Sequence, residues 1–157
     1  MSITIKKAVL WRTEVSNKPG AMGASLAPLA DQGINLDLVM GYTNPDKTLA
    51  SIEVFPIGSA KAQREARKVG FSKAEFPCVV VQGKNQAGLG KKVASALGEA
   101  GINLNFFVAQ AIDGEYVGLF SFEAQSEADL AVKVLRSALN NAPASKPSRK
   151  PRAKAIR

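Results

Sequence analysis

The chain repeats part of its own sequence, and this repeat limits its fold more than any other feature. The segment Asn17-Lys18-Pro19-Gly20 corresponds to Asn85-Gln86-Ala87-Gly88, and the block Gly-Ile-Asn-Leu at 33–36 recurs unchanged at 101–104. Both matches have an offset of 68 positions, so they belong to one continuous repeat. Self-similarity at a fixed period indicates one supersecondary unit used more than once. The sequence therefore predicts two similar units within its 157 residues.

Each unit predicts the order strand, helix, strand, strand, helix. Apolar runs at 8–11 and 78–81 are typical of buried strands, and each is followed by a polar turn. Apolar residues at helical spacing then predict a helix that ends at Gly33 in the first unit and at Gly101 in the second. Pro28 lies inside the first of these helices, where we expect a kink or a late start of the regular part.

After each glycine the apolar period changes to two, which predicts strands from Ile34 to Met40 and from Ile102 to Val108. Hairpin turns are expected at 44–47 and 113–114, before third strands at 48–55 and 115–123. Second helices are predicted at 59–69 and at 126–139, the latter opened by Ser126.

A closing strand is expected at 71–76 in the first unit, whereas the second unit runs directly from its last helix into the tail. The predicted fold class is α+β, with tandem ferredoxin-like βαββαβ repeats forming antiparallel sheets with helices on one face. The expected boundaries are 1–76 for the first domain, 77–141 for the second, and 142–157 for a disordered basic tail. Because such small units bury little surface alone, we expect them to share an extended sheet or to pack helix on helix.

Composition excludes several classes of function. The chain has no histidine and only one cysteine, which disfavours triad hydrolysis, zinc binding and an internal disulfide. No apolar stretch reaches the length of a membrane span and no signal-peptide core is present, so a cytoplasmic protein without membrane contact is expected. Cys78, beside three valines, is interpreted as a buried strand residue. We expect no metal, no cofactor and no catalytic residue.

The two loops and the helix ends resemble those of the ACT domain family. The resemblance rests on a strand that runs into an Asn/Asp-x-Pro-Gly type loop, and on a helix that ends in Gly-Ile-Asn, each present twice over residues 7–140. The second loop departs from the family pattern because Ala87 replaces the proline. Membership would imply a strand-helix-strand-strand-helix-strand order and a regulatory role based on amino-acid binding.

The residues themselves fit a small ligand. Each helix begins directly after its loop, so free backbone N–H groups and the helix dipole favour an anion such as a carboxylate. Gly20 and Gly88 let the backbone approach a ligand closely or adopt a positive φ, and the amides of Asn17 and Asn85 can donate and accept. In ACT domains the ligand lies between two domains and also touches the start of the next strand, so the resemblance implies a ligand held at the inter-domain or inter-subunit interface. The candidate ligand-binding residues are therefore Asn17, Lys18, Pro19, Gly20, Ala21, Ile34, Asn35, Asn85, Gln86, Ala87, Gly88, Leu89, Ile102 and Asn103.

Other interpretations remain open on the sequence alone. Each loop asparagine could equally cap its helix. The formal charge is +8, of which six charges lie in 143–157, so nucleic-acid binding through the tail is the alternative function. The aromatic run Gly118 to Phe122 faintly resembles an RNA-recognition strand but is interpreted as core. The acids Asp37, Glu53, Glu115 and Glu123 stand alone along strands and are expected to face solvent. The favoured hypothesis is a homodimeric amino-acid sensor that acts on a protein partner.

Overall fold

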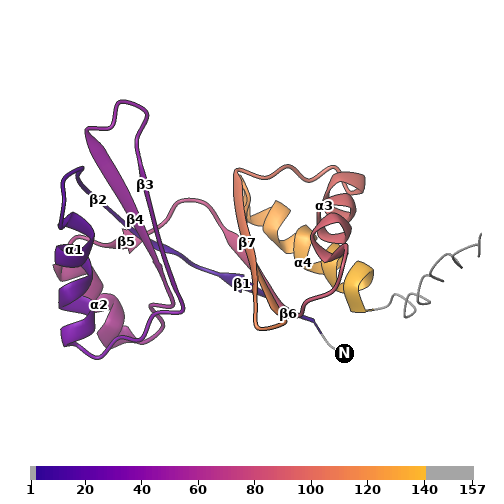
Figure 1. The fold of residues 1–157 in the computed structure, drawn as a ribbon, viewed down its shortest axis with the longest axis horizontal. Coiled ribbons are helices and arrows are strands. Elements are labelled where there is room, and N and C mark those ends of the chain that lie inside the picture. Colours follow the sequence, from indigo (N-terminus) through magenta and orange to yellow (C-terminus); the bar gives the residue numbers. More distant parts are fainter. Residues whose placement is uncertain (1–2, 141–157) are drawn as a thin grey trace, which may run out of the picture.

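A computed structural model describes residues 3–140 of the chain. Its strands and helices form two antiparallel sheets of four strands, each with two helices on one face (Figure 1). The first sheet has the order β3-β4-β2-β5 and the second has the order β1-β6-β8-β7. The predicted fold class of tandem ferredoxin-like α+β repeats is therefore confirmed.

The first domain consists of the sheet β3-β4-β2-β5 and its two helices. It contains β2 (Trp11–Ser16), α1 (Ala21–Asp31), β3 (Leu38–Thr43), β4 (Leu49–Phe55), α2 (Ala60–Lys68) and β5 (Ser72–Lys73). The second domain contains β1 (Thr4–Ala8), β6 (Cys78–Lys84), α3 (Leu89–Glu99), β7 (Phe106–Ile112), β8 (Glu115–Ser121) and α4 (Gln125–Asn140).

The helix ends follow from local sequence. Gly33, Gly70 and Gly101 have φ values of 68°, 93° and 71°, which close α1, α2 and α3 in the left-handed conformation. The next residue then donates its N–H to a carbonyl five positions earlier, as Ile34 does to Leu29 at 3.1 Å. Ser59 caps α2, because its hydroxyl accepts the Ala62 N–H at 3.0 Å.

Two local expectations about helices differ from the structure. The helix α1 begins at Ala21 and continues through Pro28 to Asp31, so the late start offered as one alternative is wrong, and the kink stays a prediction. Its buried Leu29 holds the helix against the core of the first domain. Ser126 does not open α4, because the helix begins one residue earlier. The side chain of Glu127 instead accepts the Ala124 N–H at 3.3 Å.

The N-terminal strand joins the second domain although the first domain follows it in sequence. The strand β1 pairs antiparallel with β6, with Ile5 opposite Val81, while Trp11 begins a strand of the other sheet. The apolar run 8–11 is thus divided between two sheets, and residues 4–8 do not belong to the unit 1–76 in which we expected them. Within residues 3–140 no closing strand follows α4, and β1 occupies that place beside β6.

Contacts with α4 fix β1 in this position. Ile3 and Ile5 are 7% and 4% exposed and lie in the core of the second domain. The Asn140 amide accepts the N–H of Ile3 at 3.1 Å and donates to its carbonyl at 3.3 Å. Arg136 donates to the Ile5 carbonyl at 3.2 Å. The first domain is therefore an insertion between β1 and the rest of the second domain.

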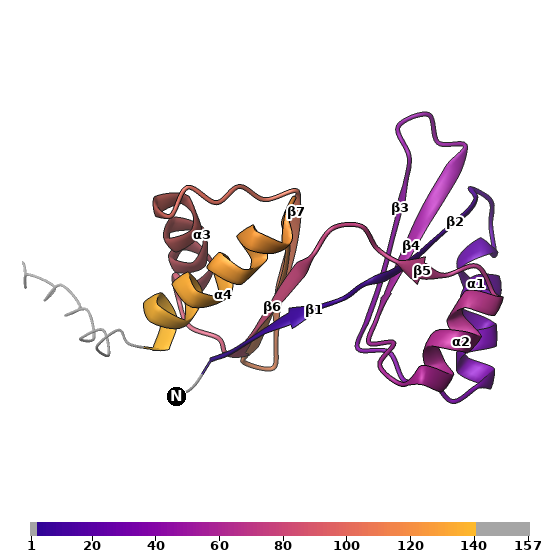
Figure 2. The same cartoon turned by 180° about the vertical axis from the view of Figure 1, so that it is seen from behind.

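Each domain has its own core, and the two domains meet through their sheets. The first core is built around Trp11, Leu29, Val54 and Phe71, and the second around Val79, Val93, Phe120 and Leu135. The helices lie on the outer sides of the molecule, so the two sheets turn their helix-free faces toward each other (Figures 1 and 2). The expected shared sheet or helix-on-helix packing between the halves is not observed.

Candidate functional site

The loop before α1 is held against the β3–β4 hairpin. The backbone N–H of Asn17 donates to the Thr48 carbonyl at 3.0 Å, and its side-chain amide donates to the Lys47 carbonyl at 2.8 Å. Gly20 is the N-cap of α1 with φ 84°, and no side chain caps the helix. The proposed capping role of Asn17 was therefore wrong, because its amide binds the hairpin instead.

The loop before α3 repeats this geometry with one difference. The Asn85 N–H donates to the Gly114 carbonyl at 2.7 Å, and Gly88 is an N-cap with φ 84° and no side-chain cap. The Asn85 side chain is exposed and makes no hydrogen bond within residues 3–140. Its amide is therefore available to a ligand, whereas that of Asn17 is already engaged.

Both helix starts leave backbone donors free. In α1 the Ala21 N–H donates to Lys18 and the Ala24 N–H to Gly20, which leaves the N–H groups of Met22 and Gly23 without an acceptor in the described part of the chain. The same pattern recurs at α3. The free donors and the helix dipole make each start suitable for a carboxylate.

The two helix starts differ in charge. The first turn of α1 holds no charged residue, whereas Lys91 and Lys92 follow Gly88 in α3. The positive end of the helix dipole repels cations near a helix N-terminus. A bound anion would offset this repulsion. A cleft of about 350 Å³ lies over this turn and is lined by Gly88, Lys91, Lys92 and Ser95 among others.

The other predicted residues lie at the far ends of the same helices. Ile34 and Asn35 follow the C-terminus of α1, and Ile102 and Asn103 follow that of α3. Each helix has 11 residues, which at 1.5 Å per residue separates its two ends by about 16 Å. Within one domain the loop and the Gly-Ile-Asn segment therefore cannot contact one small ligand together.

Not every predicted residue is accessible. Leu89 and Ile102 are 2% and 7% exposed and pack in the core of the second domain, so their side chains have a structural role. Lys18, Pro19, Gln86 and Ala87 are exposed, and Ala21 is half-buried. A cleft of about 260 Å³ is lined by Ile34 and Asn35 together with residues at the start of α2.

The contact between the two domains contains none of the predicted ligand residues. We call this contact the inter-domain seam. Its buried members are Ala8, Leu10, Cys78, Val80 and Leu119, and half-buried residues that include Leu38 and Phe55 pack against them. The predicted ligand residues therefore do not lie at this contact between the domains of one chain.

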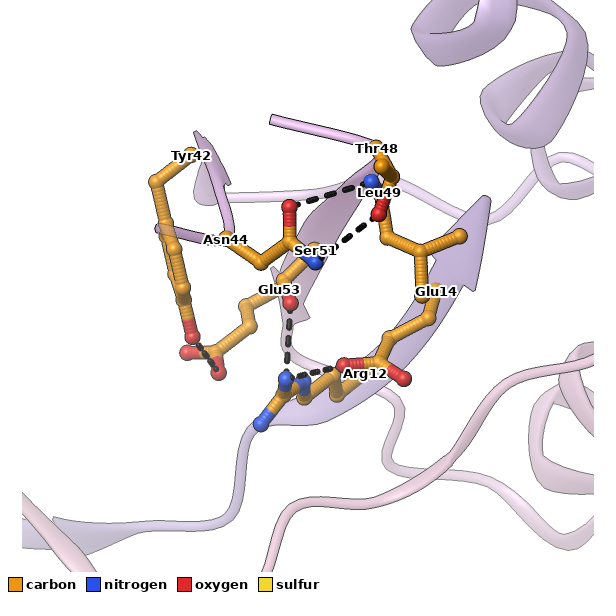
Figure 3. Close-up of polar contacts among 8 residues, drawn as sticks. All are labelled: Arg12, Glu14, Tyr42, Asn44, Thr48, Leu49, Ser51 and Glu53. Atoms are coloured by element: carbon orange, nitrogen blue, oxygen red, sulfur yellow. Dashed lines mark hydrogen bonds and ion pairs between the residues drawn. The ribbon is translucent and has the colours of Figure 1, made fainter. Parts of the chain in front are cut away.

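A partly buried polar cluster on the helix-free face of the first sheet was not predicted (Figure 3). The expectation that Glu53 faces solvent was wrong, because Glu53 is only 4% exposed and accepts a hydrogen bond from the Tyr42 hydroxyl at 3.0 Å. Arg12 lies opposite Glu53 in the register but donates to Glu14 at 2.6 Å and to Ser51 at 2.7 Å. The signal in the sequence was the alternation of polar residues with Ile52 and Val54, which shows a two-sided strand but not what covers its second side.

Burial changes two pKa values near this cluster. Burial and then the Glu53 carboxylate raise the pKa of the Tyr42 hydroxyl. Burial is also the main reason that the pKa of the Cys78 thiol is raised to about 11, with a further contribution from Glu53. The expectation of a buried Cys78 is confirmed by its 1% exposure. At neutral pH this thiol is protonated, and the thiolate form needed for nucleophilic chemistry is scarce.

Two features of the described residues bear on metal binding and on membrane spans. No group of three Asp, Glu or Cys side chains within residues 3–140 is placed to hold a metal ion. No helix in this part of the chain is both long and apolar enough to cross a bilayer. The aromatic run from Gly118 to Phe122 is buried, as expected for core.

Comparison with known proteins supports the fold. No protein-family model and no curated protein matches the chain. Among solved structures, protein BT0572 from Bacteroides thetaiotaomicron matches with a TM-score of 0.71 and 18% identity, over 85% of this chain and 89% of that one. The regulatory subunit of aspartate kinase from Thermus thermophilus, in its ligand-free form, matches with a TM-score of 0.58 and 15% identity, over 87% and 96% of the two chains. The aspartokinase alpha and beta subunits match with a TM-score of 0.58 and 21% identity, over 89% and 98%.

These similarities concern the fold. The order of elements, the two antiparallel sheets and the matched solved structures show that the chain has an ACT-type fold, with two ferredoxin-like α+β units. The resemblance seen in the sequence is confirmed at this level. A shared fold does not establish a shared ligand, which depends on the residues of the site.

Proposed function

We propose that this protein is an amino-acid-binding regulatory protein that works as a homodimer and has no catalytic activity of its own. The observation that carries the proposal is the doubled helix start, with a left-handed glycine and free backbone donors, on an ACT-type fold. The similarity to regulatory subunits of aspartate kinase supports a regulatory role. The protein that is regulated and the cytoplasmic location stay predictions.

A second copy of the chain would complete the site. In the first domain the loop before α1 lies at one end of β3 and the Gly-Ile-Asn segment lies at the other. When two edge strands pair antiparallel, opposite ends of their sheets come together. Such pairing between two copies would bring the loop of one subunit beside the Gly-Ile-Asn segment of its partner, and a ligand could then contact both.

The edge strands have the apolar character that such pairing needs. Among residues 3–140 the strands β3 and β7 each pair on one side only, which leaves a row of backbone groups open. On β3, Val39 and Tyr42 are 43% and 42% exposed, and on β7, Phe107 and Ile112 are 64% and 61% exposed. Exposed apolar side chains along an unpaired edge favour association with another strand.

The carboxylate of an amino acid fits the helix start, and the second loop offers the better site. Asn85 has a free amide, and Lys91 and Lys92 add positive charge beside the free N–H groups. The first loop offers backbone donors and Lys18, but its asparagine is engaged. We therefore place the tighter site at 85–92, in contact with a partner subunit.

Thermal unfolding against each of the twenty amino acids tests this function. A ligand present at 100 times its dissociation constant stabilises a protein by about 2.7 kcal/mol, which should raise the unfolding midpoint by several degrees. One amino acid or a related group should shift the midpoint, and the shift should be lost in Asn85→Ala. If none of the twenty shifts it, amino-acid binding is refuted.

Light scattering tests the dimer. Ile112→Lys and Val39→Lys should give monomers that no longer respond to the amino acid, because they place a charge on a free edge. Leu130→Lys is the matched control, since Leu130 is 44% exposed on α4, away from both edges. If a monomeric variant still shows the full shift of the unfolding midpoint with the amino acid, the proposal of a site shared between two subunits is wrong.

A further inference from the structure

The inter-domain seam is small for a contact that holds two domains together. Only five of its residues are buried, and two of these are Ala8 and Cys78. The chain passes between the two domains twice, from β1 to β2 and from β5 to β6. These two connections are joined by a hydrogen bond from the Ala74 N–H to the Leu10 carbonyl at 2.8 Å. A cleft of about 410 Å³ runs along these crossing segments and reaches Cys78. Relative motion is expected of domains unless their interface is large and apolar.

The Glu53 carboxylate borders this seam and forms no ion pair within residues 3–140, because Arg12, which lies opposite it in the register, pairs with Glu14 instead. Glu53 lies two residues before Phe55 on the same face of β4, and Phe55 packs in the seam. One carboxylate oxygen, Oε2, is buried and has no hydrogen-bond partner, and no cation in residues 3–140 lies within 4.0 Å of the carboxylate. The negative charge of Glu53 also contributes to the raised pKa of the Cys78 thiol, which belongs to the second domain.

We propose that the inter-domain seam is a hinge that opens and closes in solution, and that the Glu53 carboxylate favours the open state. A buried carboxylate without an ion pair loses hydration that its neighbours do not replace. Opening the seam returns water to Glu53, and closing it restores the apolar contacts of Phe55 and Leu119. These opposing contributions leave two states close in free energy, and they do not depend on the ligand loops or on dimer formation.

The single cysteine reports the opening directly. Cys78 is 1% exposed within the seam, so a thiol reagent reaches it only when the seam opens or the protein unfolds. Glu53→Gln removes the charge and keeps an oxygen to accept the Tyr42 hydroxyl. This variant should slow the labelling of the native protein about tenfold. Glu115→Gln, which removes a charge from an exposed site, should label at the wild-type rate.

A second variant and a urea series separate hinge opening from unfolding. Phe55→Ala should speed labelling at least tenfold, because it removes seam contacts. Local opening exposes little surface, so the labelling rate should depend on urea much less steeply than global unfolding does. A urea dependence as steep as that of global unfolding overturns the hinge. An unchanged or faster rate in Glu53→Gln overturns the role assigned to Glu53.

Discussion

Truncating one side chain of β1 should destabilise the domain that lies more than 70 residues away in sequence. Ile5 is 4% exposed and packs in the core of the second domain. Ile5→Ala removes three carbon atoms, worth about 2.4 kcal/mol of transfer free energy at about 0.8 kcal/mol each. The cavity left behind brings the expected loss to about 2.5–3.5 kcal/mol. For a domain of this size the loss corresponds to a midpoint shift of roughly 10–25 °C.

The two domains can be followed separately. Trp11 is the single tryptophan and is buried in the core of the first domain, so its fluorescence reports that domain. Hydrogen exchange at β6 and β8 reports the second. Ile5→Ala should increase exchange at β6 and β8 more than it changes the tryptophan transition. Ile52→Ala, the same change in the first core, should do the reverse.

Thr4 is exposed, so Thr4→Ala is the control within β1. It should change neither the hydrogen exchange at β6 and β8 nor the tryptophan transition. If Ile5→Ala costs less than about 0.5 kcal/mol, or if it destabilises only the domain of Trp11, then the assignment of β1 to the second domain is wrong.

Further predictions concern single residues. Asn17→Ala should cost about 0.5–1 kcal/mol in urea unfolding because it removes the hairpin hydrogen bond, whereas Asn85→Ala should cost almost nothing. Gly118→Ala should cost about 1–3 kcal/mol, because a Cβ there would meet the Phe120 ring at 2.6 Å. The pKa of the Cys78 thiol is raised from 9.0 to about 11. The unfolded state therefore loses its thiol proton at a lower pH than the folded state, and about 2–3 kcal/mol of stability is lost as the pH rises from 9 to 11. Cys78→Ala should remove this alkaline loss, and pH-dependent urea titrations would show it.

Local sequence was sufficient for the parts of the fold that short-range physics controls. The left-handed glycines that end α1 and α3 were predicted from their position after an apolar helical pattern. The hairpin turns at 44–47 and 113–114 were predicted from Asn, Pro, Asp and Gly. The repeat then gave the number of units, because two copies of one pattern fold in the same way.

The sequence could not show which sheet the first strand joins. The run 8–11 is apolar throughout, and apolar patterning identifies a strand without naming its partner. The structure divides this run between two sheets, because β1 fills the place beside β6 that no strand after α4 takes in the described part of the chain. The same limit applied to Glu53, whose burial depends on side chains from other strands that cover it.

The candidate site also has features that local sequence determines and features that only the tertiary structure determines. The loops, their glycines and the free helix starts follow from local sequence, since each depends on a few neighbouring residues. The tertiary structure decided that the loop and the Gly-Ile-Asn segment lie at opposite ends of one helix, and that the contact between the domains contains neither. Local conformation is set by residues adjacent in the chain, whereas the distance between two loops depends on how whole elements pack.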